Sequence, residues 1–211
     1  MKKIIASYIA SFYFVLSALF IATVFTSAYL LDNEISAGNT FTATTWTVAT
    51  TPVAINEVYY DVDPAHGNDG GADSNEWIEL YNNTSSAIPL EDWTVSDNTV
   101  IRTIGSNVSI PAKGFALISK SVNTWSYWII PADAEKINLA IGDLSNSGDR
   151  LILRDSLNNI IDQISYGTDT TILNPSISDV PEGHSISRSP NGKDTDNAGD
   201  FINSAAPTPG S

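Results

Sequence analysis

Short runs of apolar residues alternate with clusters of turn-forming residues along the chain after residue 52. The alternation is clearest between residues 77 and 81, where Ile78 and Leu80 fall on one face of a strand and Glu79 on the other. The runs are rich in Val, Ile, Tyr, Trp and Thr, and Gly, Pro, Asn and Asp separate them. The pattern predicts strands at Val53–Asp61, Glu76–Asn83, Trp93–Ser96, Val100–Ile104, Phe115–Ser119, Trp125–Ile130, Arg150–Arg154, Ile160–Tyr166 and Ser185–Arg188.

Polar turns between these runs favour antiparallel pairing. Residues 151–154 and 160–164 are apolar runs joined by the polar stretch 155–159, as in a hairpin. No segment after residue 31 keeps a helical period. The pattern therefore predicts an all-β fold, and a domain of roughly 150 residues favours a sandwich over a barrel.

The N-terminal segment has a different pattern, because residues 4–31 contain no charged side chain. As a helix this stretch would be about 42 Å long, which exceeds the ~30 Å hydrocarbon core of a bilayer. Lys2 and Lys3 precede it and Asp32 and Glu34 follow it, so we expect the lysines to stay in the cytoplasm and everything after residue 31 to lie on the extracytoplasmic side. The small residues at 26–28 would suit a signal peptidase, so residues 1–31 are predicted to be a signal peptide or a retained transmembrane anchor.

The chain divides by pattern into this export segment, a polar spacer at residues 32–52 and one domain at residues 53–211. The spacer resembles the region that follows the export helix in camelysin-like and biofilm-matrix proteins. That resemblance implies export through a specialised signal peptidase, and it is carried by Asp32, Glu34, Ser36, Gly38, Asn39, Phe41 and Ala43.

Charge excludes some partners. The whole chain has a formal net charge of −14, and the part after residue 28 keeps 8 basic and 24 acidic residues, which gives −16. Such a field repels phosphate backbones, so a nucleic-acid partner is not expected and a cation is favoured. The chain contains no cysteine, which excludes disulfides and thiolate metal sites.

An acid-rich loop between the first two predicted strands is the first candidate site. Its glycines at residues 67, 70 and 71 would let carbonyl groups turn inward, and Ca²⁺ prefers carboxylate, amide and carbonyl oxygens. The spacing matches no EF-hand, and a solvated acidic loop is the alternative. The predicted calcium ligands are Asp61, Asp63, Asp69, Asp73 and Glu76.

A second acidic cluster comprises Asp194, Asp196 and Asp200. It begins like a calcium loop, but Ala198 and Ala205 stand where oxygen ligands are expected. The alternative is a polar turn that positions Phe201 against the core.

Catalytic patterns are weak. His66 and His184 lie in polar loops without zinc-ligand spacing, and both are expected at the surface. A carboxylate pair drawn from Glu57, Glu76 and Glu79 would suit glycoside chemistry, but strand carboxylates more commonly form a solvent face or a turn clamp. The aromatic run at residues 125–128 offers a shelf for a sugar or a partner, with core packing as the alternative.

Several motifs in order resemble the lamin tail domain family over about residues 53–210. They include Asn75–Asn82 (NEWIELYN), Ile110–Phe115 (IPAKGF), Leu144–Asp149 (LSNSGD) and Ser185–Arg188 (SISR). The resemblance implies an immunoglobulin-like β-sandwich, which in prokaryotic exported proteins serves as a non-catalytic module with no agreed ligand. We therefore expect a secreted or cell-surface module that binds a protein or a polysaccharide. A small exported hydrolase and a self-associating matrix subunit are the alternatives.

The calcium hypothesis predicts saturable heat of Ca²⁺ binding when the full chain, freed of metal with a chelator, is titrated calorimetrically. Melting should shift upward in the same buffer. Absence of both heat and melting shift would end the hypothesis.

Overall fold

The computed structural model describes residues 51–68 and 75–211. The chain divides into two units, Met1–Trp46 and Thr47–Ser211, and the predicted export helix at residues 1–31 lies outside the described residues. Within the described ranges, no helix has the length and apolar character needed to cross a membrane.

The described chain is built mainly of β-strands, as the alternating pattern predicts. Three short 3-10 helices interrupt them: η1 (Pro64–His66), η2 (Val122–Tyr127) and η3 (Ala198–Asp200). The strands are β1 (Val53–Tyr59), β2 (Trp77–Asn82), β3 (Ile88–Pro89), β4 (Thr94–Ser96), β5 (Ile101–Thr103), β6 (Ser109–Ile110), β7 (Phe115–Ser119), β8 (Glu135–Asn138), β9 (Arg150–Arg154), β10 (Ile160–Ser165), β11 (Ser185–Arg188) and β12 (Phe201–Ser204).

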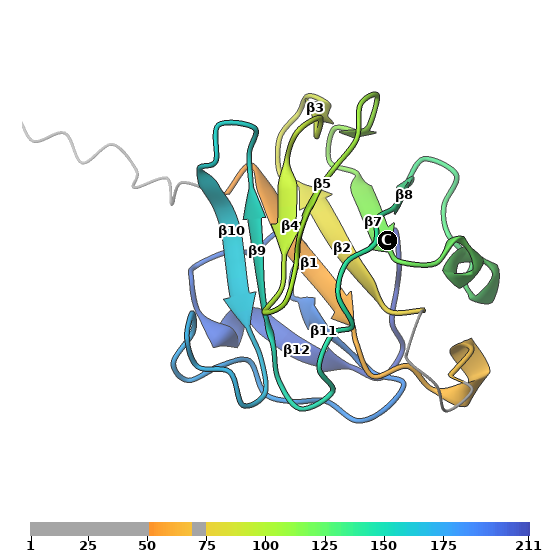
Figure 1. The fold of residues 1–211 in the computed structure, drawn as a ribbon, viewed down its shortest axis with the longest axis vertical. Helices are drawn as coiled ribbons and strands as arrows, with labels where there is room; N and C mark the ends of the chain where they lie inside the picture. The colour runs from red at the N-terminus through yellow and green to blue at the C-terminus, as the bar shows by residue number, and fades with distance from the viewer. Residues whose placement is uncertain (1–50, 69–74) are drawn as a thin grey trace, which may run out of the picture. The chain divides into compact units, whose positions relative to one another are not determined.

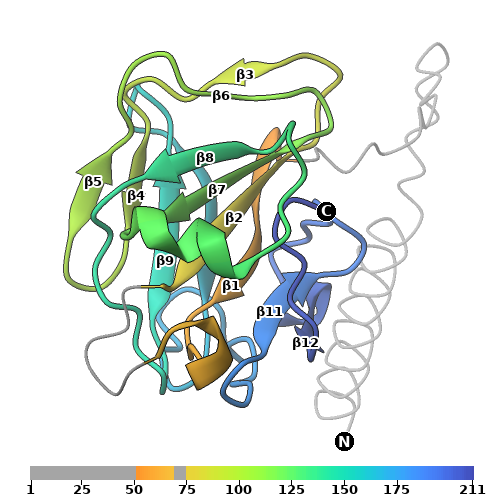
Figure 2. The same ribbon diagram turned by 90° about the vertical axis from the view of Figure 1, so that its right-hand side faces the viewer.

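The strands form three sheets (Figure 1). A six-stranded sheet has the order β12-β11-β1-β2-β7-β8, and a four-stranded sheet has the order β10-β9-β4-β5. All pairings are antiparallel except that of β7 with β8. The small β3-β6 sheet lies at one end of the domain (Figure 2).

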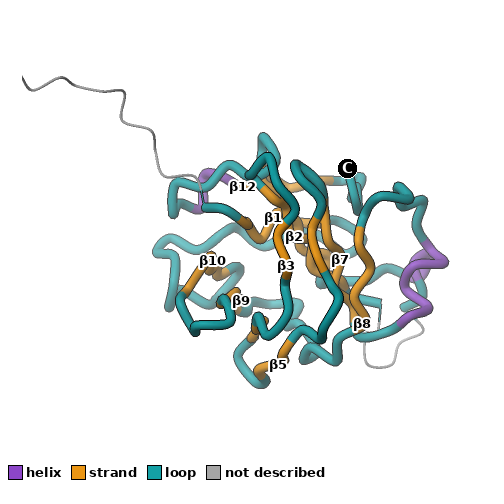
Figure 3. Tube along the Cα trace, turned by 90° about the horizontal axis from the view of Figure 1, so that it is seen from above, coloured by secondary structure: helices purple, strands orange, loops and turns teal. Residues whose placement is uncertain are grey.

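The two larger sheets share one hydrophobic core. Seen from above, β9, β10 and β5 lie on one side of the domain and β1, β2, β7 and β8 on the other (Figure 3). Alternation sends Ile78 and Leu80 of β2 inward, where both are fully buried with Leu151 and Leu153 of β9 in the same cluster. Burying such side chains stabilises the fold by about 1.5–3 kcal/mol each.

The structure corrects one predicted strand and adds several short ones. Residues 125–130 are not a strand, because Ser121 caps η2 by accepting a hydrogen bond from the Asn123 backbone N–H. Four strands of two to four residues were not predicted, namely β3, β6, β8 and β12. They carry too few alternating positions to give a periodic signal; β8, for example, buries only Ile137.

A glycine substitution tests the close approach of two loops in this fold. Gly167 has φ 59°, and a Cβ atom there would lie 2.3 Å from the Ser147 carbonyl oxygen. We expect Gly167→Ala to destabilise the domain by more than about 1 kcal/mol in chemical denaturation. Gly105→Ala is the matched control, because no heavy atom lies within 4 Å of its Cβ position, and an equal loss in both variants would contradict this account.

Candidate functional site

The predicted acidic loop is only partly gathered in the structure. Asp61 accepts a hydrogen bond from the side-chain amide of Asn146 at 2.8 Å, and buried Glu76 accepts one from the Leu144 backbone N–H at 3.0 Å. Asp63 instead faces η1. Asp69 and Asp73 lie outside the described residues. The described members of the loop are therefore bonded to different parts of the chain.

Asp63 organises a histidine and a tyrosine at the start of this loop. It caps η1 by accepting from the His66 backbone N–H at 3.0 Å, and the same oxygen is 2.5 Å from His66 Nδ1. The Tyr59 hydroxyl donates to Asp63 at 3.2 Å. Partial burial acts to raise the pKa of Asp63, but the hydrogen bonds from His66 and Tyr59 and the charge of His66 together outweigh it and hold that pKa below its usual value.

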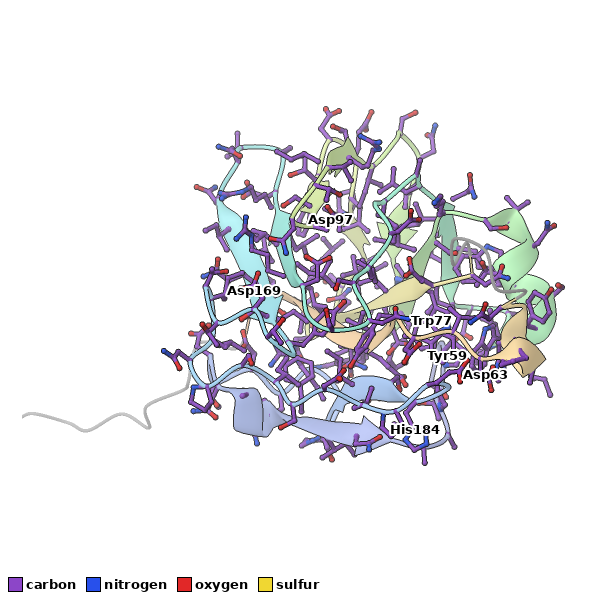
Figure 4. The ribbon with its side chains drawn as sticks, turned by 60° about the horizontal axis from the view of Figure 1, so that its bottom comes forward. Tyr59, Asp63, Trp77, Asp97, Asp169 and His184 are labelled. Carbon is purple, nitrogen blue, oxygen red and sulfur yellow. The ribbon has the colours of Figure 1, made fainter. Side chains whose placement is uncertain are left out.

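An aromatic cluster covers the outer face of the six-stranded sheet beside η1. The His66 ring stacks on Trp128 with centroids 4.0 Å apart, which corrects the expectation of a plain surface histidine. Tyr59 stacks on Trp77 at 5.7 Å, and both belong to a second buried cluster with Val62 and Leu117. Figure 4 shows Tyr59, Asp63 and Trp77 close together, whereas Asp97, Asp169 and His184 lie elsewhere.

Two indole groups in this cluster bury their polar atoms. Nε1 of Trp77 and Nε1 of Trp128 have no hydrogen-bond partner within the described part of the chain. Trp77 is fully buried. The cluster is thus held by ring packing rather than by hydrogen bonds of the indoles.

The segment that carries Trp128 also presents apolar side chains outward. Val122 is 64% exposed, Tyr127 43% and Ile129 100%. Residues 121–132 contain no charged side chain, in a chain with 24 acidic residues. We call residues 121–132 the η2 protrusion; η2 lies beside η1 at one end of the domain (Figure 1). It is an uncharged, partly aromatic surface on an otherwise acidic protein.

The second acidic cluster surrounds a buried arginine. Nη1 of Arg188 lies 3.3 Å from Asp194 and 3.6 Å from Asp200, and its Nη2 lies 3.0 Å from Asp162 of β10. The guanidinium also lies over the Phe201 ring at 4.4 Å. Burial raises the pKa of Asp162 to about 6 although Arg188 acts to lower it, so the carboxylate is still ionised at neutral pH.

Arg188 therefore supplies a positive charge to Asp194 and Asp200 of the second cluster. Asp200 also accepts hydrogen bonds from Thr195 and contacts Lys193 Nζ at 3.0 Å. Asp196 has a positive φ of 53° in the turn. Among the described residues, no group of three or more His, Asp or Glu side chains is placed to hold a metal ion. The calcium expectation for both loops stays a prediction.

Two further carboxylates are buried on neighbouring strands. Glu57 of β1 and Glu79 of β2 face each other in register, and both are fully buried. Glu57 accepts hydrogen bonds from Ser185 and Thr208, and Glu79 accepts from Asn56 and from the Gly210 backbone N–H. They are therefore neither a solvent face nor an open catalytic pair.

A groove of about 340 Å³ lies beside the edge strand β12. Its lining includes Ile177, Val180, Phe201 and Ile202. Its one carboxylate, Asp179, accepts a hydrogen bond from the Tyr60 hydroxyl at 2.7 Å.

This is a domain of mostly β-sheet structure, and the Lamin Tail Domain family matches its residues 47–168. The chain belongs to the lamin tail domain family. No curated protein matches the chain.

A solved structure supports the fold. The chain is similar to a DUF4876 family protein from Bacteroides thetaiotaomicron VPI-5482, with a TM-score of 0.52 and 13% sequence identity. The similarity covers 75% of this chain and 72% of that protein. At this identity the likeness concerns the fold alone.

Arg188 allows a test of the buried ion cluster. Arg188→Met keeps an apolar side chain of similar length but leaves three carboxylates without their shared cation, so we expect a loss of about 3–5 kcal/mol in unfolding free energy. Arg150→Met is the matched control, because Arg150 is half-exposed and 3.9 Å from Asp169; it should cost under about 1 kcal/mol. Similar costs for the two variants would refute the structural role of Arg188.

Proposed function

We propose that this domain is an exported, cell-surface or secreted module that works by binding a partner rather than by catalysis. The observation that carries the proposal is the η2 protrusion, where Val122, Tyr127 and Ile129 are exposed within one short stretch of the chain. Exposed apolar side chains that adjoin one another mark interaction sites more often than scattered ones do. Export is inferred from the charge-free residues 4–31 and the preceding lysines.

The ligand that best fits the η2 protrusion is a neutral polysaccharide. Aromatic rings such as the exposed Tyr127 and the half-buried Trp125 can pack against the apolar face of a sugar ring. The acidic field of the domain would repel an anionic polymer, whereas a neutral polymer would meet no such repulsion. A protein partner with an uncharged patch is the second candidate for the same surface.

The described carboxylates favour binding over hydrolysis. A glycosidase needs two carboxyl groups that can reach the substrate. Glu57, Glu76 and Glu79 are buried and hydrogen-bonded to other parts of the chain. We also propose that the two larger sheets form the immunoglobulin-like sandwich that the lamin tail resemblance implies, with the η2 protrusion as its binding end.

Binding of the full chain, in mild detergent, to immobilised neutral polysaccharides and cell-envelope fractions tests the proposal. Tyr127→Ala and Ile129→Ser should each weaken retention about tenfold, which corresponds to roughly 1.4 kcal/mol. Leu157→Ser is the matched control, because Leu157 is 81% exposed on the β9–β10 turn, and it should bind as the native chain does.

Two results would contradict the proposal. Unchanged retention in both η2 variants would remove this surface from binding. Turnover of generic glycoside, ester or peptide substrates by the purified chain would replace the binding module with the hydrolase alternative.

A further inference from the structure

The C-terminal segment crosses the outer face of the six-stranded sheet. The chain end lies on the side of this sheet away from β9 and β10 (Figure 3). Pro209 and Gly210 are buried, and the Cβ position of Gly210 lies 2.9 Å from Pro131 and 3.1 Å from Ala134. We call residues 205–211 the C-terminal strap; it is held between the sheet and the residues that follow η2.

Two buried carboxylates hold this strap through its backbone. Glu79 accepts a hydrogen bond from the Gly210 N–H at 2.6 Å. Glu57 accepts from the Thr208 N–H at 3.2 Å and from the Thr208 hydroxyl at 3.2 Å. Three of the strap's polar groups thus end on an adjacent pair of acids, and no apolar strap residue larger than proline anchors it.

Neither Glu57 nor Glu79 contacts a positively charged side chain among the described residues. The other hydrogen-bond donors are neutral: Asn56 to Glu79 at 2.7 Å, and Ser185 to Glu57. Glu57 disfavours the ionisation of Glu79. On the other side of β2, Glu79 pairs with Leu117 of β7, and Leu117 pairs with Lys136 of β8, an exposed residue that forms no ion pair with either acid. Neither acid forms an ion pair with any described residue. Two like charges without a cation are costly in a dry site.

We propose that Glu57 and Glu79 form a pH-sensitive clasp that holds the C-terminal strap closed when the pair is protonated and releases it when the pair is fully ionised. Release lets water reach both carboxylates, and this hydration removes the cost of burying a second charge. The clasp lies in the sheet face, and its strap meets the η2 protrusion at Pro131.

The direction of the pH dependence follows from linkage. Burial raises the pKa of Glu79 to about 8, and burial also raises the pKa of Glu57. The closed form therefore holds its proton more tightly than the open form, in which a solvated Glu has a pKa near 4.5. The closed strap is fully favoured below pH 4.5, and the fraction released grows by up to tenfold per pH unit until about pH 8.

A nitroxide at the chain end tests the clasp directly. The chain has no cysteine, so Ser211→Cys places one spin label at the strap in the full chain. We expect an immobilised spectrum at pH 5 and a mobile component that grows toward pH 9. The same label on a Glu79→Gln background, which keeps the acceptor oxygen but cannot ionise, should stay immobilised at both pH values.

Two controls separate strap release from loss of the fold. A label on the Leu157→Cys variant should give one spectrum across the range, because the β9–β10 turn does not contact the pair, and far-UV circular dichroism should not change. Glu57→Gln provides a second background if Glu79→Gln folds poorly. A spectrum at residue 211 that does not change with pH, or one that changes equally in the Gln backgrounds, would overturn the clasp.

Discussion

Burial of carboxylates in a chain with few cations is the constraint on which much of this structure depends. The sequence has 24 acidic and 10 basic residues, yet Glu57, Glu76, Glu79, Asp149, Asp162 and Asp200 are all buried. A buried charge that lacks partners costs several kcal/mol, so each of these groups must find donors inside the fold. Arg188 supplies a cation for Asp162 and Asp200, whereas Glu57 and Glu79 depend on neutral donors.

These internal bonds fix the ends of the domain onto its sheets. Arg188 of β11 bonds to the Ile55 carbonyl of β1 and to Asp162 of β10, so it connects the two larger sheets. The strap and its acid pair close the outer face of β1 and β2. With so many polar groups engaged internally, the surface that remains distinctive is the uncharged η2 protrusion. That contrast between an acidic domain and a neutral aromatic end is what favours binding as the function.

Much of the fold could be predicted from the sequence because long strands carry a strong signal. Alternation at residues 77–81 correctly placed Ile78 and Leu80 in the core. The same alternation put Glu79 on the other face, where a solvent face and a turn clamp were the two alternatives; Glu79 is fully buried under the strap, which excludes the solvent face. The aromatic content of residues 125–130 predicts a strand, but residues 122–127 form the 3-10 helix η2, which Ser121 caps. The alternation along a strand shows which side chains share a face of the sheet. It does not show which distant segment of the chain covers that face.

The candidate sites were harder to predict than the strands. The aspartates at 194 and 200 looked like metal ligands because their spacing was visible, while the arginine that pairs with them lies outside that acidic cluster, at the end of β11. A clue was present in Ser185–Arg188, since a strand that ends in arginine next to an acidic turn can form a buried ion cluster. The stacking of His66 on Trp128 joins residues 62 positions apart, and no local pattern reports such a contact.

The claim that buried carboxylates hold this domain together is tested most directly by titrating the side-chain carboxyl carbons by NMR. The account predicts a pKa of about 8 for Glu79 and about 6 for Asp162, each above its value in an unfolded chain. Values near 4.5 for Glu79 and 3.8 for Asp162 would show that burial does not raise either pKa, and would contradict the account.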